Sequence, residues 1–168
     1  MTKKTDKKDV PANDQSEVNE NHSVMVNVQY IKDFSFENPG APESLLPSKE
    51  APKINVGVDV GVKKLEDKTY EVTLITSAEA TRGDDKLFMA ELSYAGVFTL
   101  NIPEKDKEPA LMVYCPGLLF PYARQIISEV TRQGNFPPLL IDPIDFGSLY
   151  VQYKQRQAAE GAEKKEDK

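Results

Sequence analysis

Apolar and polar residues alternate over four stretches of the chain between residues 24 and 100. In the first stretch, one set of alternate positions is mainly apolar: Val24, Val26, Val28, Tyr30, Phe34 and Phe36. The other set is polar: Asn27, Gln29, Asp33, Ser35 and Glu37. Because successive side chains of a strand point to opposite faces of a sheet, this pattern predicts a half-buried β-strand.

Three further stretches repeat the alternation, over residues 54–62, 70–74 and 88–94. In the last stretch the apolar positions are Phe88, Ala90, Leu92 and Tyr94, and the outward positions are Met89, Glu91 and Ser93. Short turns near residues 66–68 and at Asp84-Asp85 predict an antiparallel meander. The connection between the first and second stretches is longer, and its prolines exclude a helix or a central strand.

Helical spacing appears only after these four stretches. Ala123, Ile126, Ile127 and Val130 lie at i, i+3, i+4 and i+7, with Pro121 in the first turn and Gly134 as the stop, which predicts a helix over residues 121–132. A second stripe follows a capping Asp145 and contains Phe146, Leu149, Tyr150 and Tyr153. We therefore predict an α+β fold, with a four-stranded antiparallel sheet packed with two C-terminal helices.

Length and composition indicate one domain. The chain has 168 residues, of which 39% are hydrophobic, enough for a single core. Residues 1–23 and 158–168 are rich in charge and poor in apolar side chains, which predicts a disordered N-terminal arm and a disordered C-terminal tail. The folded domain is expected at residues 24–157.

The charge balance narrows the class of partner. A net charge of −6 and a pI near 4.9 argue against nucleic acid and against anionic lipid, since both need clustered Lys and Arg. One cysteine cannot form an intrachain disulfide, and no apolar run approaches the ~20 residues that span a bilayer. We expect a cytoplasmic protein without direct membrane insertion.

Catalytic and cofactor motifs are weak. The glycines of "GVDVGV", residues 57–62, alternate with other residues inside a strand pattern, and no helix follows to receive a phosphate. His22 is the only histidine, so neither a Ser-His-Asp triad nor a histidine-based metal site is expected within one chain. No cofactor is predicted.

Cys115 allows two interpretations. A thiol near a helix N-terminus can act as a nucleophile when its pKa is depressed. No basic partner is visible here, and the neighbouring Val113, Tyr114 and Leu118 are largely apolar, which favours a buried structural thiol. The protein is therefore expected not to be an enzyme.

Two groups of residues point to binding instead. Apolar residues crowd the proline-rich connections, where they either cover the core or form a surface for a partner. They are Leu45, Leu46, Phe136, Leu139, Leu140, Ile141 and Ile144. On the outward parity of the strands, a methionine lies among carboxylates, which is either an ordinary solvated face or a contact for a basic partner. These residues are Asp33, Glu37, Met89 and Glu91.

Several segments resemble the SecB family of protein-export chaperones. They are "YIKDFSFENPGAP", "GVFTL", "YCPGLLFPYARQIISEVTRQGNFPPLLIDPIDF" and "LYVQYKQRQAAEG", and the similarity extends from about Val24 to Gly161. The resemblance implies a homotetramer built as a dimer of dimers, with the helix from Pro121 to Arg132 in the oligomer interface. The interface residues implied are Tyr122, Ala123, Ile126, Ile127 and Val130.

The resemblance also implies a function. SecB proteins hold unfolded preproteins without ATP and deliver them to SecA, whose zinc-bearing C-terminal region is one of the contacts. The implied SecA-binding residues are Asp33, Glu37, Met89 and Glu91. The implied client-binding groove comprises Leu45, Leu46, Phe136, Leu139, Leu140, Phe146, Leu149 and Tyr150. A SecB-like chaperone with another dedicated client, such as an antitoxin, remains the alternative.

Overall fold

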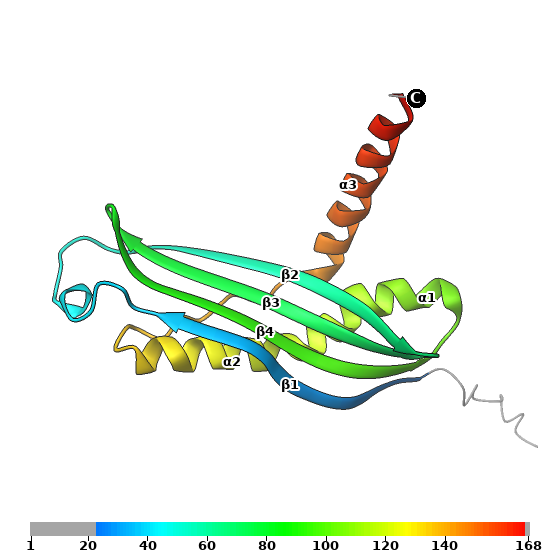
Figure 1. Cartoon of the computed structure of the whole chain (residues 1–168), viewed down its shortest axis with the longest axis horizontal. Helices are drawn as coiled ribbons and strands as arrows, with labels where there is room; N and C mark the ends of the chain where they lie inside the picture. The colour runs from blue at the N-terminus through cyan, green and yellow to red at the C-terminus, as the bar shows by residue number, and fades with distance from the viewer. Residues whose placement is uncertain (1–22, 167–168) are drawn as a thin grey trace, which may run out of the picture.

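The computed structural model describes residues 23–166, with side chains described up to residue 158. Four antiparallel strands form one sheet: β1 (Ser23–Glu37), β2 (Lys53–Glu66), β3 (Thr69–Arg82) and β4 (Asp85–Asn101). Their order in the sheet is β1-β4-β3-β2 (Figure 1). The expected sheet is confirmed, but only β2, β3 and β4 form a meander. The long first connection lets β1 pair with β4 instead of β2, as in a Greek key.

Two register shifts in β1 change the predicted alternation. The shifts lie between Val26 and Val28 and between Ile31 and Asp33. Each inserts one extra residue, which moves the following side chains to the other face. Val28 therefore lies opposite Val97 on the outer face, whereas the second shift returns the end of the strand to its original parity. The prediction that Val28 and Tyr30 share a face with Val24 is wrong.

The core lies on the inner face of the sheet, the face that helix α2 covers. Phe88 and Leu92 of β4 are 3% and 1% exposed, and Phe98 is fully buried. Their outward neighbours Met89 and Glu91 keep solvent contact, so the predicted alternation in β4 is confirmed.

The helical segment begins earlier than predicted. Helix α1 (Glu104–Pro109) and a π-helical turn, η2 (Ala110–Tyr114), lead directly into α2 (Cys115–Gln133). Pro121 therefore lies inside the helix, where it removes the hydrogen bond to the carbonyl of Gly117. Gly117 is exposed, so water can satisfy that carbonyl. Gly134 ends the helix as predicted, and its N–H donates to the carbonyl of Val130 at 2.8 Å.

Helix α3 (Phe146–Glu166) is anchored at one end and projects from the body of the molecule (Figure 1). At its base Phe146 is 5% exposed and packs edge-on against Phe120, with ring centroids 6.1 Å apart. The N–H of Ser148 donates to Asp145 Oδ1 at 3.0 Å, which confirms the predicted cap. The helix continues past residue 157, where the sequence predicts the end of the domain. The predicted N-terminal arm lies outside the described residues except for Ser23.

Candidate functional site

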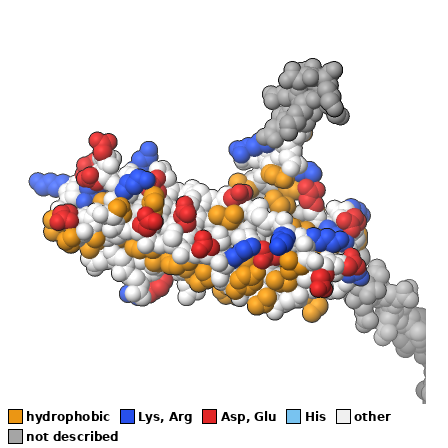
Figure 2. All heavy atoms as spheres, viewed as in Figure 1, with side chains coloured by type: hydrophobic (Ala, Val, Ile, Leu, Met, Phe, Trp, Pro, Cys, Tyr) orange, Lys and Arg blue, Asp and Glu red, His pale blue; other side chains and the backbone are white. Residues whose placement is uncertain are grey.

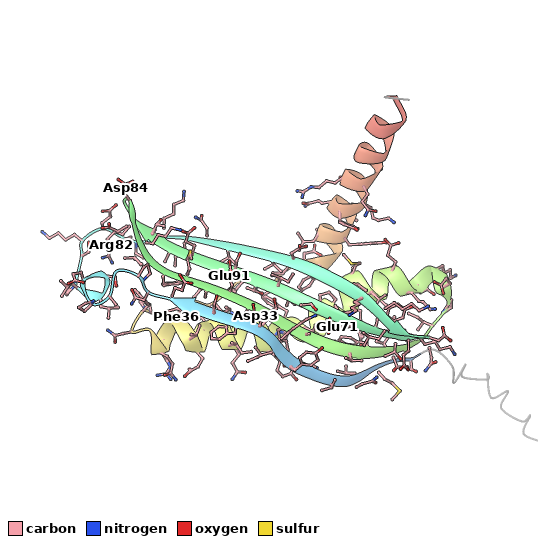
Figure 3. The ribbon with its side chains drawn as sticks, in the orientation of Figure 1. Asp33, Phe36, Glu71, Arg82, Asp84 and Glu91 are labelled. Carbon is pink, nitrogen blue, oxygen red and sulfur yellow. The ribbon has the colours of Figure 1, made fainter. Side chains whose placement is uncertain are left out.

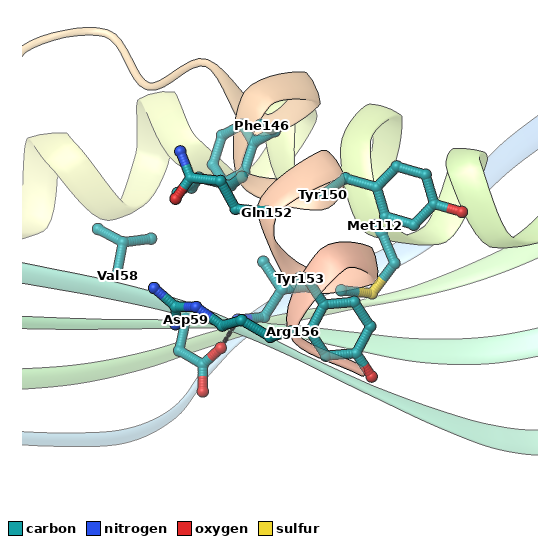
Figure 4. Close-up of a pocket in the computed structure, with 10 residues that line it drawn as sticks. Val58, Asp59, Met112, Phe146, Tyr150, Gln152, Tyr153 and Arg156 are labelled. Atoms are coloured by element: carbon teal, nitrogen blue, oxygen red, sulfur yellow. Dashed lines mark hydrogen bonds between the residues drawn. The ribbon is translucent and has the colours of Figure 1, made fainter. Parts of the chain in front are cut away.

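An apolar groove lies between the base of α3 and the edge strand β2. We call it the α3 groove, and it is a cavity of about 150 Å³. Its apolar lining comes from three elements (Figure 4): Val58 and Val60 of β2, Met112 of η2, and Phe146, Leu149, Tyr150 and Tyr153 of α3. Its polar lining consists of Asp59, Gln152 and Arg156. Aliphatic, aromatic and thioether groups together suit an apolar chain segment of variable shape.

The groove exists because α2 covers only part of the inner face. Helix α2 contacts β4 and β3, whereas the inner-face residues Val58 and Val60 of β2 extend beyond it. On α3, residues 149, 150 and 153 are at helical spacing that places them on one side, facing these valines. The edge of the sheet and the start of α3 thus leave an apolar channel between them.

An ion pair between Lys154 and Glu108 links α3 to α1. The ammonium of Lys154 donates to both carboxylate oxygens of Glu108, at 3.0 and 3.1 Å. The same ammonium lies 5.9 Å from the centroid of the Tyr150 ring, within the range of a cation–π contact. Both charged side chains are about half exposed, so the pair orients α3 more than it stabilises the fold.

Only some of the predicted groove residues meet in the α3 groove. Phe146, Leu149 and Tyr150 line it, and Phe146 is also part of the core. The others lie elsewhere: Leu45 and Leu46 in the connection after β1, and Phe136, Leu139 and Leu140 in the loop after α2. Among these, Leu46 and Leu140 are 63% and 64% exposed and stay available to a partner.

The loop after α2 is partly fixed by the core. Phe136 packs on Phe88 with ring centroids 5.0 Å apart, and Leu139 is half-buried. The N–H of Leu139 donates to the buried hydroxyl of Thr131 at 2.9 Å. The side chains of Phe136 and Leu139 therefore contribute to packing of the interior at least as much as to a groove.

The sequence patterns missed four groove residues: Val58, Val60, Met112 and Tyr153. The alternation predicts the valines only as strand positions, and Met112 lies in a helical segment that the sequence patterns do not predict. Tyr153 was recognised as part of the α3 stripe, and that stripe was the one usable signal for its place in the groove.

The four predicted acidic-face residues share the outer face of the sheet. Glu37 lies opposite Met89 across the β1–β4 pairing, and Asp33 lies opposite Ser93, which is two residues from Glu91. Directly paired residues project to the same face. Figure 3 labels Asp33 and Glu91 on the neighbouring strands β1 and β4, part-way along their length, and Figure 2 shows acidic side chains spread over the viewed face. We call Asp33, Glu37, Met89 and Glu91 the acidic face.

A neutralised cluster borders the acidic face. The carboxylate of Glu71 accepts hydrogen bonds from the ammonium of Lys32 and the hydroxyl of Tyr30. The hydrogen bond from Lys32, followed by that from Tyr30, lowers the pKa of Glu71, and the bond to Glu71 raises the pKa of Tyr30. Because its charge is balanced locally, Glu71 contributes less to the field of the outer face than a free carboxylate would.

A second apolar surface lies between α2 and β1. Five side chains form it, and we call it the α2–β1 surface: Ile31, Phe34, Tyr122, Ile126 and Val130. They border a hollow of about 530 Å³, where the half-exposed Tyr122 stacks on Tyr94 with ring centroids 6.0 Å apart. The β1 edge of the molecule is correspondingly rich in apolar side chains in Figure 2.

Two of the predicted interface residues belong to the core instead. Ala123 and Ile127 are fully buried within this chain, because they face the sheet. They therefore expose no side-chain surface outside this chain, whereas Tyr122, Ile126 and Val130 of the predicted interface keep solvent contact. Glu129 pairs within its own helix with Arg132 and Gln133, and the hydrogen bond from Arg132 lowers the pKa of Glu129 to about 2.

Cys115 has the properties of a structural thiol. It is fully buried, and burial raises the pKa of its thiol from 9.0 to about 12. A thiol that is protonated at neutral pH and closed to solvent is a poor nucleophile. The interpretation as a buried thiol is confirmed.

The other weak motifs also lie in structural positions. "GVDVGV" lies inside β2, and Asp84 lies at the β3–β4 turn beside Gly83, whose φ is +58°. Among the described residues, no cluster of three or more His, Cys, Asp or Glu side chains is arranged for a metal ion. No helix of the described chain is long and apolar enough to cross a membrane.

Comparison with known proteins gives a consistent result. The family model described as preprotein translocase subunit SecB matches residues 17–157. A protein-export protein SecB of Maricaulis maris is 51% identical over 133 residues, which cover 78% of this chain and 77% of the relative. A protein of the same name from Parvibaculum lavamentivorans is 53% identical over 135 residues, covering 80% of each chain.

A solved structure supports the fold. The SecB-like chaperone Rv1957 of Mycobacterium tuberculosis, determined in complex with a ChAD peptide from the HigA1 antitoxin, superposes with a TM-score of 0.60. The match covers 72% of this chain and 90% of the other, at 12% sequence identity. At that identity the likeness concerns the fold alone.

Proposed function

This chain belongs to the SecB family, and we propose that it is a cytoplasmic, ATP-independent chaperone that keeps unfolded preproteins competent for export and delivers them to SecA. The α3 groove is the observation that carries this proposal beyond family membership. Its lining is mainly apolar and aromatic, and Asp59, Gln152 and Arg156 are its polar members. Such a surface favours extended apolar segments, which unfolded chains expose and folded proteins bury.

Client holding is tested by refolding. Excess purified protein is expected to delay the refolding of a slow-folding preprotein, and Leu149→Ser combined with Tyr153→Ser weakens this delay several-fold. Val151→Ser is the matched control, because Val151 is 54% exposed on the same helix but does not line the groove. A wild-type protein that causes no delay contradicts the proposal, and equal loss in the control contradicts the role of the groove.

The acidic face is the proposed contact for SecA. Carboxylates on a rigid sheet attract a basic segment, and Met89 adds an adaptable apolar contact. Asp33→Lys combined with Glu91→Lys is expected to abolish binding of SecA's zinc-bearing C-terminal peptide in titration calorimetry, with client holding unchanged. Unchanged peptide affinity excludes this face as the contact.

The α2–β1 surface is the proposed site of assembly into a homotetramer, a dimer of dimers. Ile31 is 51% exposed and Phe34 is 38% exposed on an edge strand, and such apolar edges promote association. Arg124 of α2 supports the same conclusion, because its Nε is buried without a hydrogen-bond partner in the described residues. Light scattering should give a mass near four chains, and a monomer would exclude this assembly.

Restraint of an antitoxin is the second candidate function. Its support is the fold shared with the M. tuberculosis SecB-like chaperone, at 12% identity. The relatives at 51% and 53% identity bear the name protein-export protein, which favours export. Binding of the SecA peptide distinguishes the two, because a chaperone dedicated to an antitoxin has no need of that contact.

A further inference from the structure

Lys86 contacts Met89, the one apolar residue of the acidic face. Its ammonium is 3.0 Å from Glu79 Oε1 and donates to the sulfur of Met89 at 3.5 Å. The side chain of Lys86 is 54% exposed and that of Glu79 is 36% exposed, so both reach solvent. A lysine of the chain itself therefore occupies a place where a basic partner would make contact.

The strand register surrounds Met89 with carboxylates. Glu37 lies opposite Met89 on β1, and Glu79 lies opposite it on β3, so all three project from one row on the outer face. Directly paired side chains have Cβ atoms roughly 5 Å apart. Glu91 follows two residues along β4 and projects to the same face. Of these three carboxylates, Glu79 is the one that forms an ion pair with Lys86.

A second position for the Lys86 side chain lies close to the first. Lys86 lines a hollow of about 560 Å³ at the β3–β4 turn together with Asp84 and Asp85. Both aspartates are exposed and lie within two residues of Lys86 in the sequence. A lysine side chain is long and flexible, so its ammonium can leave Met89 and remain beside negative charge.

We propose that Lys86 is a specificity-determining residue of the acidic face, acting as an internal cation that a basic partner displaces. While Lys86 is in place, it covers Met89 and neutralises Glu79. When the partner's cation arrives, Lys86 moves toward the turn, Met89 is uncovered, and Glu79 becomes a further carboxylate of the contact. This inference rests on the proposed function, because it assumes that the acidic face binds SecA.

The displacement is feasible because the contact it breaks is weak. Ion pairs between exposed side chains contribute little, since water and salt screen both charges. A partner that offers only charge gains little over Lys86 itself. A partner that offers both a cation and an apolar group also gains the contact with Met89, so Lys86 favours mixed basic and apolar segments over purely basic ones.

The test is calorimetric titration of the full-length protein with SecA's zinc-bearing C-terminal peptide. Lys86→Gln is expected to tighten binding by about threefold to fivefold, since it removes a like charge and frees Met89. Glu79→Gln should weaken binding by a similar factor, both alone and in the Lys86→Gln background. Lys105→Gln is the matched control, because it makes the same charge change on the exposed side of α1.

A second titrant separates charge from the apolar contact. An oligolysine peptide should distinguish wild type from Lys86→Gln only at low salt, whereas the SecA peptide should keep part of the difference at high salt. Thermal melting of each variant verifies that it is folded.

The outcomes separate the inference from the proposed function. Binding by the wild type that Lys86→Gln and Lys105→Gln change equally overturns the role of Lys86 and leaves the acidic face in place. Absence of binding by the wild type and by both variants overturns the proposed SecA contact, and the inference falls with it.

Discussion

Ile126 and Ile127 are the same residue type at adjacent positions of α2, yet they belong to different regions of the molecule. Ile127 is fully buried against the sheet and is part of the core. Ile126 is only partly buried and borders the hollow of the α2–β1 surface. One turn of helix thus carries two apolar sides, one that the chain covers itself and one that it leaves uncovered.

The difference shows how one pattern can support both folding and assembly. A helix rotates its side chains by about 100° per residue, so a wide apolar stripe cannot face a single sheet along its whole width. The side toward β3 and β4 is covered by the fold. The side toward β1 remains open, and we propose that a second copy covers it.

The largest expected effect comes from placing a charge on the open side. Ile126→Asp should abolish assembly, because a carboxylate in an apolar contact is costly to desolvate. Light scattering should show the mass falling below four chains. Ile54→Asp is the control, because Ile54 is 45% exposed, more than the half-buried Ile126, and lies on the opposite edge strand. A full tetramer in the Ile126→Asp variant contradicts the assignment of the α2–β1 surface.

Truncation on the covered side should destabilise the chain instead. Ile127→Ala leaves a cavity in the core and is expected to lower the free energy of unfolding by about 2–5 kcal/mol. Urea denaturation at one fixed protein concentration measures this loss, since assembly also affects apparent stability. Ile126→Ala serves as the comparison and should change the intrinsic stability less. Similar losses in both variants at low protein concentration would remove the distinction between the two sides.

The hydrogen bond between the Leu139 N–H and the Thr131 hydroxyl is a polar contact on the covered side of α2, and a substitution can test it. Thr131 is fully buried, and its hydroxyl accepts the N–H of Leu139 while donating to a carbonyl of its own helix. Thr131→Val leaves the N–H of Leu139 without its acceptor and should cost about 1–3 kcal/mol in the free energy of unfolding. Hydrogen exchange should show faster exchange at Leu139. Unchanged exchange there would mean that the loop is held by its apolar contacts alone.

The smallest expected effect concerns Glu129 on the open side. The hydrogen bond from Arg132 lowers the pKa of Glu129 from 4.5 to about 2 in the folded chain. A lowered pKa in the folded state stabilises it above the unfolded pKa, and this contribution is lost as the pH falls from 4.5 toward 2. Wild type and Glu129→Gln should therefore converge in urea midpoint over this range. A constant difference between them would assign the effect to something other than this carboxylate.

Much of the sheet could be predicted from the sequence because strand alternation is a local property. The faces of Met89 and Glu91 followed directly from parity, and the pairing of β4 confirms them. The two shifts in β1 could not be predicted, since they are defined by the register against β4, which lies far along the chain. The alternation consequently predicts the wrong face for Val28.

The ends of the helices could likewise be predicted only in part from the sequence. The stop at Gly134 and the cap at Asp145 depend on neighbouring residues, and both were predicted. The sequence predicts the start of this helix at Pro121, because proline suits the first helical turn and is costly in a helix interior. Packing of the preceding residues Leu119 and Phe120 against the core outweighs that local cost, and the helix begins at Cys115.

The two parts of the candidate site also differ in how far local sequence patterns predict them. The acidic face was predictable because Met89 and Glu91 lie on a strand of clear parity, and because the second shift in β1 returns Asp33 and Glu37 to their original parity. The α3 groove was only half predictable, since Val58, Met112 and Tyr153 come from three elements that no single periodicity connects.

The amino-acid sequence alone determined the fold class, the family, the alternation of three strands and the apolar stripes of both helices, because each depends on residue type and short spacing. Only the tertiary structure decided the strand order, the bulges in β1, the separation of Ile126 from Ile127, and the position of Lys86 over Met89. Those features depend on which distant segments meet and how much of an apolar stripe they cover, and no local pattern contains that information.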